Sequence, residues 1–330
     1  MRLPLTILAA GWLALGAAHA QQLDKVTFAT NWVAQAEHGG FYQAVADGTY
    51  KKHGLDVTIL PGGPNVNHRL QLIAGRVEFY MSANTLQAFD AVAQNIPTLV
   101  ISAIFQKDPQ VMIAHPGSGF DNFDKMRGRP LLISNGSRST FWPYLRKKYG
   151  LSDAQLRPYN FNMAPFLADP QAIQQGFVTS EVYSIAQALG KQPEALLIAD
   201  AGFSAYQTTI AISRKLAGEK KDLIQRFVDA TLEGWAQYLK GGPAIEAANA
   251  LIKKDNPEQT DDRILHAIKE LNARGIVRSG EALTGGIGAM SDKRWSDFYH
   301  SMTDVGVLPP GLDVRQAYTL EFVNKGLGRN

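Results

Sequence analysis

The chain has 330 residues, with 33 Lys and Arg against 30 Asp and Glu, and it contains no cysteine. This length is long for a single hydrophobic core and typical of two lobes. The near balance of charge requires neither a nucleic-acid partner nor a membrane surface. The lack of cysteine excludes disulfides, thiol catalysis and cysteine metal sites.

The first twenty residues have the features of a Sec-type signal peptide. Arg2 provides a short positive region, residues 3–18 are almost wholly apolar, and residues 18–20 (AHA) form a small-x-small cleavage site. An uncleaved anchor is the alternative, but the apolar run is shorter than the roughly 20 residues that span a bilayer. A lipid anchor would need a cysteine at the cleavage point. We therefore predict cleavage after Ala20 and free export to the periplasm of a two-membrane bacterium.

Strand and helix patterns alternate through the next eighty residues. The pattern predicts strands at 25–30, 55–60, 77–81 and 97–105 and helices at 38–53, 65–74 and 84–94. Gly48 is a weak point in the first helix, and Gly75 ends the second. This alternation indicates βαβ units and a mostly parallel sheet.

The alternation restarts near residue 130 and then gives way to helices. We expect strands at 130–134, 157–162, 177–179, 196–199 and 206–213, and helices at 140–149, 165–175 and 181–189. The remaining chain predicts helices at 220–240, 243–253 and 261–273, a break at 285–288 and two more helices. Two α/β blocks followed by helices suit a two-lobed protein whose tail packs back on the first lobe.

Four motifs now carry a resemblance to a known family. They are NWVAQAEHGGFYQA (31–44), GTYKKHGLDV (48–57) running into PGGP (61–64), AGRVEF (74–79) and QGFVTSEVY (175–183). Together they resemble the NMT1/THI5-like, ThiY/SsuA-like substrate-binding proteins. The resemblance covers roughly the whole chain after the signal peptide. Ligands vary within the group and include thiamine pyrimidine precursors, riboflavin and sulfonates.

The resemblance implies a bilobal type II periplasmic-binding-protein fold, with two α/β lobes joined by two crossing strands and the ligand in the cleft. We place lobe 1 at 21–108 and 205–330, and lobe 2 at 109–204. The crossings fall near 105–114 and 198–211. The implied function is that of a monomeric binding component of an ABC importer, which closes on a small molecule and docks on an inner-membrane permease. A sensor subunit that presents ligand to a membrane receptor is an alternative.

Loops at the carboxyl ends of strands face the cleft in such a fold. Trp32 follows the first strand and offers a flat face to a planar ring, with stacking worth about 0.5–1.5 kcal/mol beyond area burial; the alternative is a core position. The candidate ligand-binding residues are Asn31, Trp32, Tyr80, Ser82, Asn84, Phe105, Asn135, Ser137, Arg138, Ser139, Thr140 and Glu181.

Two polar features point to different ligands. Glu181 begins a helix, where it could cap the helix or accept hydrogen bonds from an aminopyrimidine, as the resemblance implies. Residues 134–140 (SNGSRST) combine hydroxyls, backbone N–H groups and Arg138 at a helix start, which suits an anion such as a sulfonate. Our first hypothesis is a thiamine-precursor aminopyrimidine. Riboflavin, a sulfonate or an aromatic acid are the alternatives.

The family also includes eukaryotic pyrimidine-precursor synthases, which consume a histidine and pyridoxal phosphate. They depend on a Lys and a His in the segment that matches residues 80–89 and on a cysteine-rich run. Here that segment reads YMSANTLQAF, and the chain has no cysteine. The histidines also lack metal-site spacing such as H-E-x-x-H. We therefore expect neither enzymatic activity nor a cofactor nor a metal.

Overall fold

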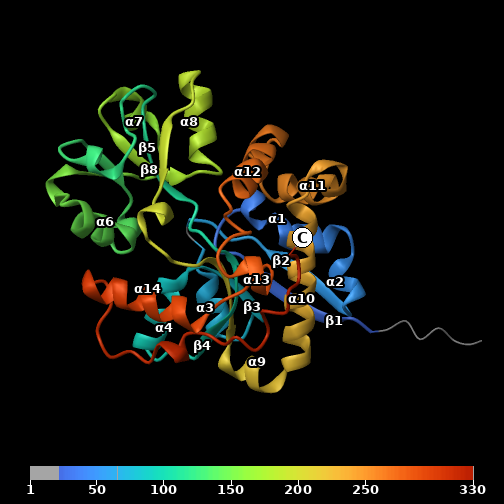
Figure 1. Ribbon diagram of the computed structural model, residues 1–330. Helices are drawn as coiled ribbons and strands as arrows, with labels where there is room; N and C mark the ends of the chain where they lie inside the picture. Colours follow the sequence, from blue (N-terminus) through green and yellow to red (C-terminus); the bar gives the residue numbers. More distant parts are fainter. Residues whose placement is uncertain (1–21, 65, 330) are drawn as a thin grey trace, which may run out of the picture.

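The computed structural model describes residues 22–64 and 66–329, which form two five-stranded sheets (Figure 1). The first sheet has the order β2-β1-β3-β10-β4 and the second β7-β6-β8-β5-β9. In the first sheet, β10 runs antiparallel to β3 and β4, and in the second β5 runs antiparallel to β8 and β9. The strands are β1 (Asp24–Ala29), β2 (Leu55–Leu60), β3 (Phe79–Asn84), β4 (Thr98–Phe105), β5 (Gln110–Ala114), β6 (Leu131–Ile133), β7 (Leu156–Pro158), β8 (Ile173–Phe177), β9 (Glu194–Leu197) and β10 (Gln207–Ser213).

Each sheet with its helices forms one lobe. The helices of lobe 1 are α1 (Gly39–Ala46), α2 (Thr49–Lys52), α3 (His68–Ile73), α4 (Thr85–Ala93), α9 (Arg214–Glu219), α10 (Lys221–Tyr238), α11 (Glu246–Asp255), α12 (Asp261–Ala273), α13 (Ala282–Gly285) and α14 (Asp292–Asp304). Those of lobe 2 are α5 (Asn135–Arg138), α6 (Phe141–Tyr149), α7 (Ala164–Ala168) and α8 (Glu181–Leu189). Short 3-10 turns are η1 (Ala36–His38), η2 (Phe123–Met126), η3 (Asp153–Gln155), η4 (Ala199–Ala201), η5 (Gly242–Ile245) and η6 (Val314–Gln316).

The C-terminal helices return to lobe 1, as predicted. The apolar face of α10 packs on α1 and α2, and its Phe227 ring stacks on Phe79 of β3 at a centroid distance of 3.8 Å. The approach to α1 is close: a Cβ atom at Gly39 would lie 1.9 Å from the Tyr238 ring, and one at Gly40 would lie 2.1 Å from the Trp235 ring. The predicted architecture, two α/β lobes with a helical tail on lobe 1, is confirmed.

The chain passes between the sheets twice, at residues 106–109 and 198–206. We propose the lobe limits at these passages, close to the predicted limits of 21–108 with 205–330 and 109–204. Within the described residues, no helix combines the length and the apolar character needed to cross a membrane. The predicted signal peptide, residues 1–20, lies outside the described part of the chain.

Several predicted elements were wrong in extent, among them the strands predicted at 157–162 and 177–179, which end at Pro158 and Phe177. The helix predicted at 165–175 ends at Ala168, and β8 begins at Ile173, because Asp169-Pro170 cannot continue a helix. The helix predicted at 38–53 is divided at Gly48, whose φ of 75° is left-handed. After residue 288 only α14 and the short turn η6 form within the described residues, since a Pro-Pro-Gly segment at 309–311 breaks the run.

Candidate ligand-binding site

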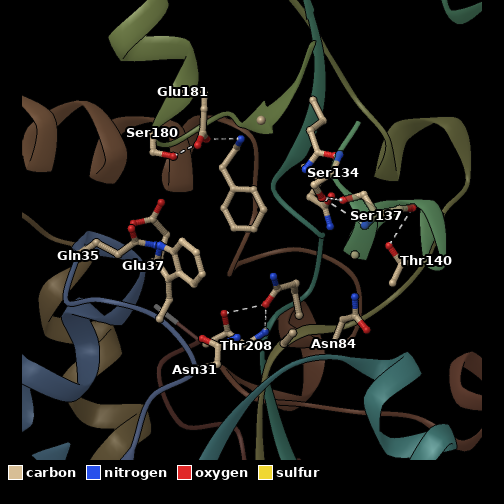
Figure 2. A pocket seen from close by; sticks show the side chains of 18 of the residues that line it. Asn31, Gln35, Glu37, Asn84, Ser134, Ser137, Thr140, Ser180, Glu181 and Thr208 are labelled. Atoms are coloured by element: carbon tan, nitrogen blue, oxygen red, sulfur yellow. Dashed lines mark hydrogen bonds between the residues drawn. The ribbon is translucent and has the colours of Figure 1, made fainter. Parts of the chain in front are cut away.

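A cavity of about 330 Å³ lies where the two sheets meet (Figure 2). This volume is about twice that of a ~150 Å³ cavity that holds one benzene ring, so it accommodates more than a single ring. Lobe 1 contributes Asn31, Trp32, Gln35, Glu37, His38, Met81, Ala83, Asn84, Phe105, Gln207 and Thr208. Lobe 2 contributes Gln110, Ser134, Gly136, Ser137, Thr140, Tyr159, Phe161, Gln175, Gly176, Phe177, Ser180 and Glu181.

The structure brings part of the predicted set to this cavity, from five segments of the chain. The predicted residues that line it are Asn31, Trp32, Asn84, Phe105, Ser137, Thr140 and Glu181. Figure 2 shows the polar members on several sides, with Asn31 and Asn84 across from Glu181, and Ser137 and Thr140 on a further side.

Two predicted residues of β3 point away from the cavity. Side chains alternate along a strand, and here Met81 and Ala83 line the cavity, so Tyr80 and Ser82 face the other side. Tyr80 is buried in a small apolar cluster that includes Leu72 of α3. The Ser82 hydroxyl instead forms a hydrogen bond with the Thr209 hydroxyl of β10.

Three predicted residues around α5 also lie outside the cavity lining. Asn135 and Ser139 are exposed. Arg138 contributes to the electrostatic environment of Asp153. The Asp153 pKa is lowered first by the hydrogen bond from the Trp142 indole N–H, and also by the positive charges of Arg146 and Arg138. No Lys or Arg lines the cavity within the described residues. The predicted anion site therefore lacks its cation, and α5 has only four residues.

The loop that carries Trp32 is held by the PGGP turn. The Gly62 amide donates to the Trp32 carbonyl at 3.1 Å and to the Thr30 hydroxyl at 3.1 Å. A Cβ at Gly62 would lie 2.4 Å from the Thr30 carbonyl oxygen, so only glycine allows this approach. Two of the motifs that carried the family resemblance thus pack together and hold the backbone from which the indole projects.

Trp32 faces an aromatic side chain from the opposite lobe. Its ring centroid lies 5.6 Å from that of Phe161 at an interplanar angle of 48°, and Phe161 lies 5.3 Å from Tyr159. Phe161 is 57% exposed, although it is a large apolar residue. Tyr159 and Phe161 were not predicted as site residues, because residues 157–162 were predicted as a strand. The available signal was YNFN (159–162), aromatic and amide side chains directly after β7.

Glu181 lies at the first turn of α8 and braces the loop before it. Its Oε2 accepts hydrogen bonds from the Phe177 amide at 2.8 Å and from the Ser180 hydroxyl at 2.6 Å. No described residue donates a hydrogen bond to its Oε1. The carboxylate is thus held in place and keeps one oxygen for the cavity. Both sequence readings, a local hydrogen-bonding role and a ligand contact, are compatible with this geometry.

Two further polar groups of the cavity, Glu37 and His38, were missed as site residues although they belong to the first motif. Glu37 is only 4% exposed, and burial raises its pKa, partly opposed by a hydrogen bond from the Thr179 hydroxyl of lobe 2. Burial lowers the pKa of His38 to about 3, so its ring is neutral. Its buried Nδ1 has no hydrogen-bond partner among the described residues. A neutral imidazole offers a ligand one donor and one acceptor.

Two α/β lobes with a cavity at their junction define the periplasmic-binding-protein fold. The crystal structure of the periplasmic aliphatic sulphonate binding protein SsuA from Escherichia coli is similar, with a TM-score of 0.64 and 13% identity over 89% of this chain and 91% of that one. The family model described as NMT1/THI5 like matches residues 35–243, and the chain belongs to this family.

Two relatives carry names that describe different roles. The riboflavin-binding protein RibY of Chloroflexus aurantiacus is 24% identical over 92% of this chain and 87% of its own length. The 4-amino-5-hydroxymethyl-2-methylpyrimidine phosphate synthase of Schizosaccharomyces pombe is 26% identical, but over only 43% of this chain and 41% of its own.

Proposed function

We propose that this protein is the periplasmic solute-binding component of an ABC importer and that it binds a planar, ring-bearing solute between its lobes. The chain is a monomer that closes on the ligand and docks on an inner-membrane permease. Closure is a shift of population toward the form that buries the ligand. The predicted signal peptide and the family membership support export and transport.

One observation carries the proposal: aromatic rings from both lobes face each other across the cavity. Trp32 and Phe161 lie 5.6 Å apart at 48°. The two rings contact each other directly at this distance, so a planar ligand that stacks on both would take the place of this contact and join the lobes. Such stacking contributes about 0.5–1.5 kcal/mol per aromatic pair beyond the burial of area.

An aminopyrimidine of the thiamine-precursor type is the ligand we favour. Its exocyclic amino group is a hydrogen-bond donor that matches the carboxylate of Glu181, and its ring nitrogens match the donors of the neutral His38 and the amide side chains. The lack of a Lys or Arg among the described lining residues argues against a sulfonate or an aromatic acid.

Riboflavin is the second candidate, and two observations favour it. The relative RibY matches nearly the whole chain. The cavity volume of about 330 Å³ also exceeds what a single ring needs. An enzymatic role has less support, since the synthase relative matches under half of the chain and the segment 80–89 lacks Lys and His.

The test is direct binding by the purified mature protein. Native mass spectrometry identifies any co-purified solute, and calorimetry compares hydroxymethylpyrimidine, riboflavin, an alkanesulfonate and an aromatic acid. We expect a ring compound to bind with micromolar affinity or better and Trp32→Ala to abolish detectable binding. Binding of the alkanesulfonate alone, unaffected by Trp32→Ala, would refute the ligand class. The absence of binding to any of them would count against the transport role itself.

A further inference from the structure

Two carboxyl groups reach the cavity, one from each lobe. Glu37 belongs to the turn η1 of lobe 1, and Glu181 begins α8 of lobe 2. Figure 2 shows the Glu37 carboxylate turned toward Ser180 and Glu181. The Thr179 hydroxyl, which precedes these two residues in lobe 2, donates a hydrogen bond to Glu37 Oε1. Closure of the lobes therefore brings both carboxyl groups to one side of one cavity.

The two carboxyl groups have no cationic partner in the described part of the chain. Neither takes part in an ion pair there. Among the described residues, the positive charge of Arg263 of α12 lowers the Glu37 pKa. Burial is the main cause that raises the Glu37 pKa, and the raising effect of Glu181 exceeds the lowering effect of Arg263.

Burial and the neighbouring Glu181 both disfavour the charged form of Glu37, and two ionised carboxylates at this place would repel each other with little water to screen them. Closure without ligand is therefore opposed by this pair. A positively charged group between the carboxylates reverses the sign of the interaction, because it attracts both. The free Oε1 of Glu181 provides an acceptor for such a group, and Glu37 supplies a second acceptor from the opposite lobe.

We propose, on the basis of the proposed function, that the ligand is a cationic nitrogen heteroaromatic whose positive group lies between Glu37 and Glu181. Its charge couples binding to closure, because only a cation offsets the repulsion that closure creates. Glu37 is thereby a specificity-determining residue of the site. Neutral rings bind more weakly, through the aromatic faces and uncharged hydrogen bonds, and anionic rings are excluded.

A matched pair of probes isolates the charge. 4-Amino-5-aminomethyl-2-methylpyrimidine carries an ammonium group at neutral pH, whereas its hydroxymethyl analogue is neutral and of nearly the same size. We expect the wild-type protein to bind the aminomethyl compound about tenfold more tightly, the size of a hydrogen bond to a charged group. Riboflavin serves as a neutral, larger ring compound in the same calorimetric series.

Glu37→Gln and Glu181→Gln keep size and a hydrogen-bond acceptor but remove one charge each. We expect each to reduce the preference for the ammonium compound to about threefold or less, and this ratio is the readout because the hydroxymethyl compound also contacts the site through its amino group. Glu219→Gln, on the exposed end of α9, is the matched control and should retain the full preference. Small-angle scattering should show ligand-free Glu37→Gln to be more compact than ligand-free wild type.

The outcomes separate this inference from the proposed function. Equal binding of the two pyrimidines by wild type, or a preference that survives both Gln variants, overturns the cationic ligand. Tight binding of riboflavin with no binding of either pyrimidine also overturns it, while the transport role stands. Unchanged compactness of Glu37→Gln overturns the coupling to closure. If no ring compound binds at all, the proposed function fails as well.

Discussion

Gly176 of β8 lies directly against Glu181 of α8: a Cβ atom at Gly176 would lie 2.7 Å from the Glu181 Cβ and 2.7 Å from the Ile113 Cδ1. We predict that Gly176→Ala displaces Glu181 and disrupts its hydrogen bond from the Phe177 amide. Ligand affinity should fall about tenfold, and the free energy of unfolding should fall by about 1–3 kcal/mol, the usual cost of overpacking. Calorimetry and urea denaturation measure the two effects.

A second substitution separates the contact of the new methyl group with Glu181 from its contact with Ile113. Ile113→Val removes the Cδ1 atom that the new methyl group would meet. In the double variant we expect part of the stability to return but the affinity to stay low, because Glu181 remains displaced. Recovery of affinity together with stability would show that crowding at Ile113, rather than the position of Glu181, weakens binding.

The exposed ring of Phe161 contributes to binding and little to folding. Phe161→Ala should lower affinity for ring compounds about tenfold, through lost stacking and lost apolar contact. Its unfolding midpoint should hardly change, because the side chain is 57% exposed. Leu283→Ala, at a residue 65% exposed on α13, is the control and should change neither quantity.

Since Phe161 has a φ of 65°, Phe161→Gly should be more stable than Phe161→Ala by about 1 kcal/mol. A loss of stability without a loss of affinity would reverse this assignment.

Asp108, in the first passage between the lobes, should make stability depend on pH. Burial raises its pKa to about 6 from an ordinary value of 3.8, although Gln110 donates two hydrogen bonds to it. The folded protein therefore holds this proton more tightly than the unfolded chain, and stability is lost as pH rises from about 4 to about 6. Asp108→Asn removes this dependence.

The measurement is the difference in unfolding free energy between Asp108→Asn and wild type at several pH values. This difference should grow by up to about 3 kcal/mol between pH 4 and pH 7, at about 1.4 kcal/mol per pKa unit. Asp56→Asn, on the exposed side of β2, controls for unspecific effects of charge. A difference that stays constant with pH would contradict the raised pKa.

His266 of α12 links the C-terminal helices to lobe 2. Its Nε2 lies 3.1 Å from the Val178 carbonyl oxygen, and its ring lies 5.3 Å from the Tyr183 ring. His266→Ala should favour the open form and weaken all ligands alike, by about threefold to tenfold, the worth of one hydrogen bond. Faster dissociation in stopped-flow fluorescence should account for the loss. Weakening of one ligand class only would indicate a direct ligand contact instead.

Local signals in the sequence predicted the scaffold well. Residues 55–60 and 261–273 form β2 and α12 as predicted, since regular alternation marks the first and the Thr260 cap the start of the second. The fold class followed from the order of such elements. The helix predicted at 165–175 was wrong because Pro170 lacks a backbone N–H and disfavours a helical residue before it, so α7 ends at Ala168.

The candidate site was predicted in part, and its errors have two physical causes. Tyr80 and Ser82 were expected at the cavity, but a one-residue difference in register moves a side chain to the other face of a strand. Contacts between the lobes cannot be predicted from local sequence patterns. Thr179 and Glu37 are 142 residues apart, and their hydrogen bond depends on how the lobes are oriented.

Every described residue that lines the cavity lies between Asn31 and Thr208, so the C-terminal third of the chain supplies none of the ligand contacts. Its helices instead press on the Gly39-Gly40 pair next to His38 through Tyr238 and Trp235. The chain therefore has two segments with separate roles. Residues 22–213 contact the solute, and the C-terminal helices support the part of lobe 1 that carries the cavity. Exchanging residues 22–213 between relatives should carry ligand preference into a new host chain, provided that the two glycines meet aromatic rings of matching size.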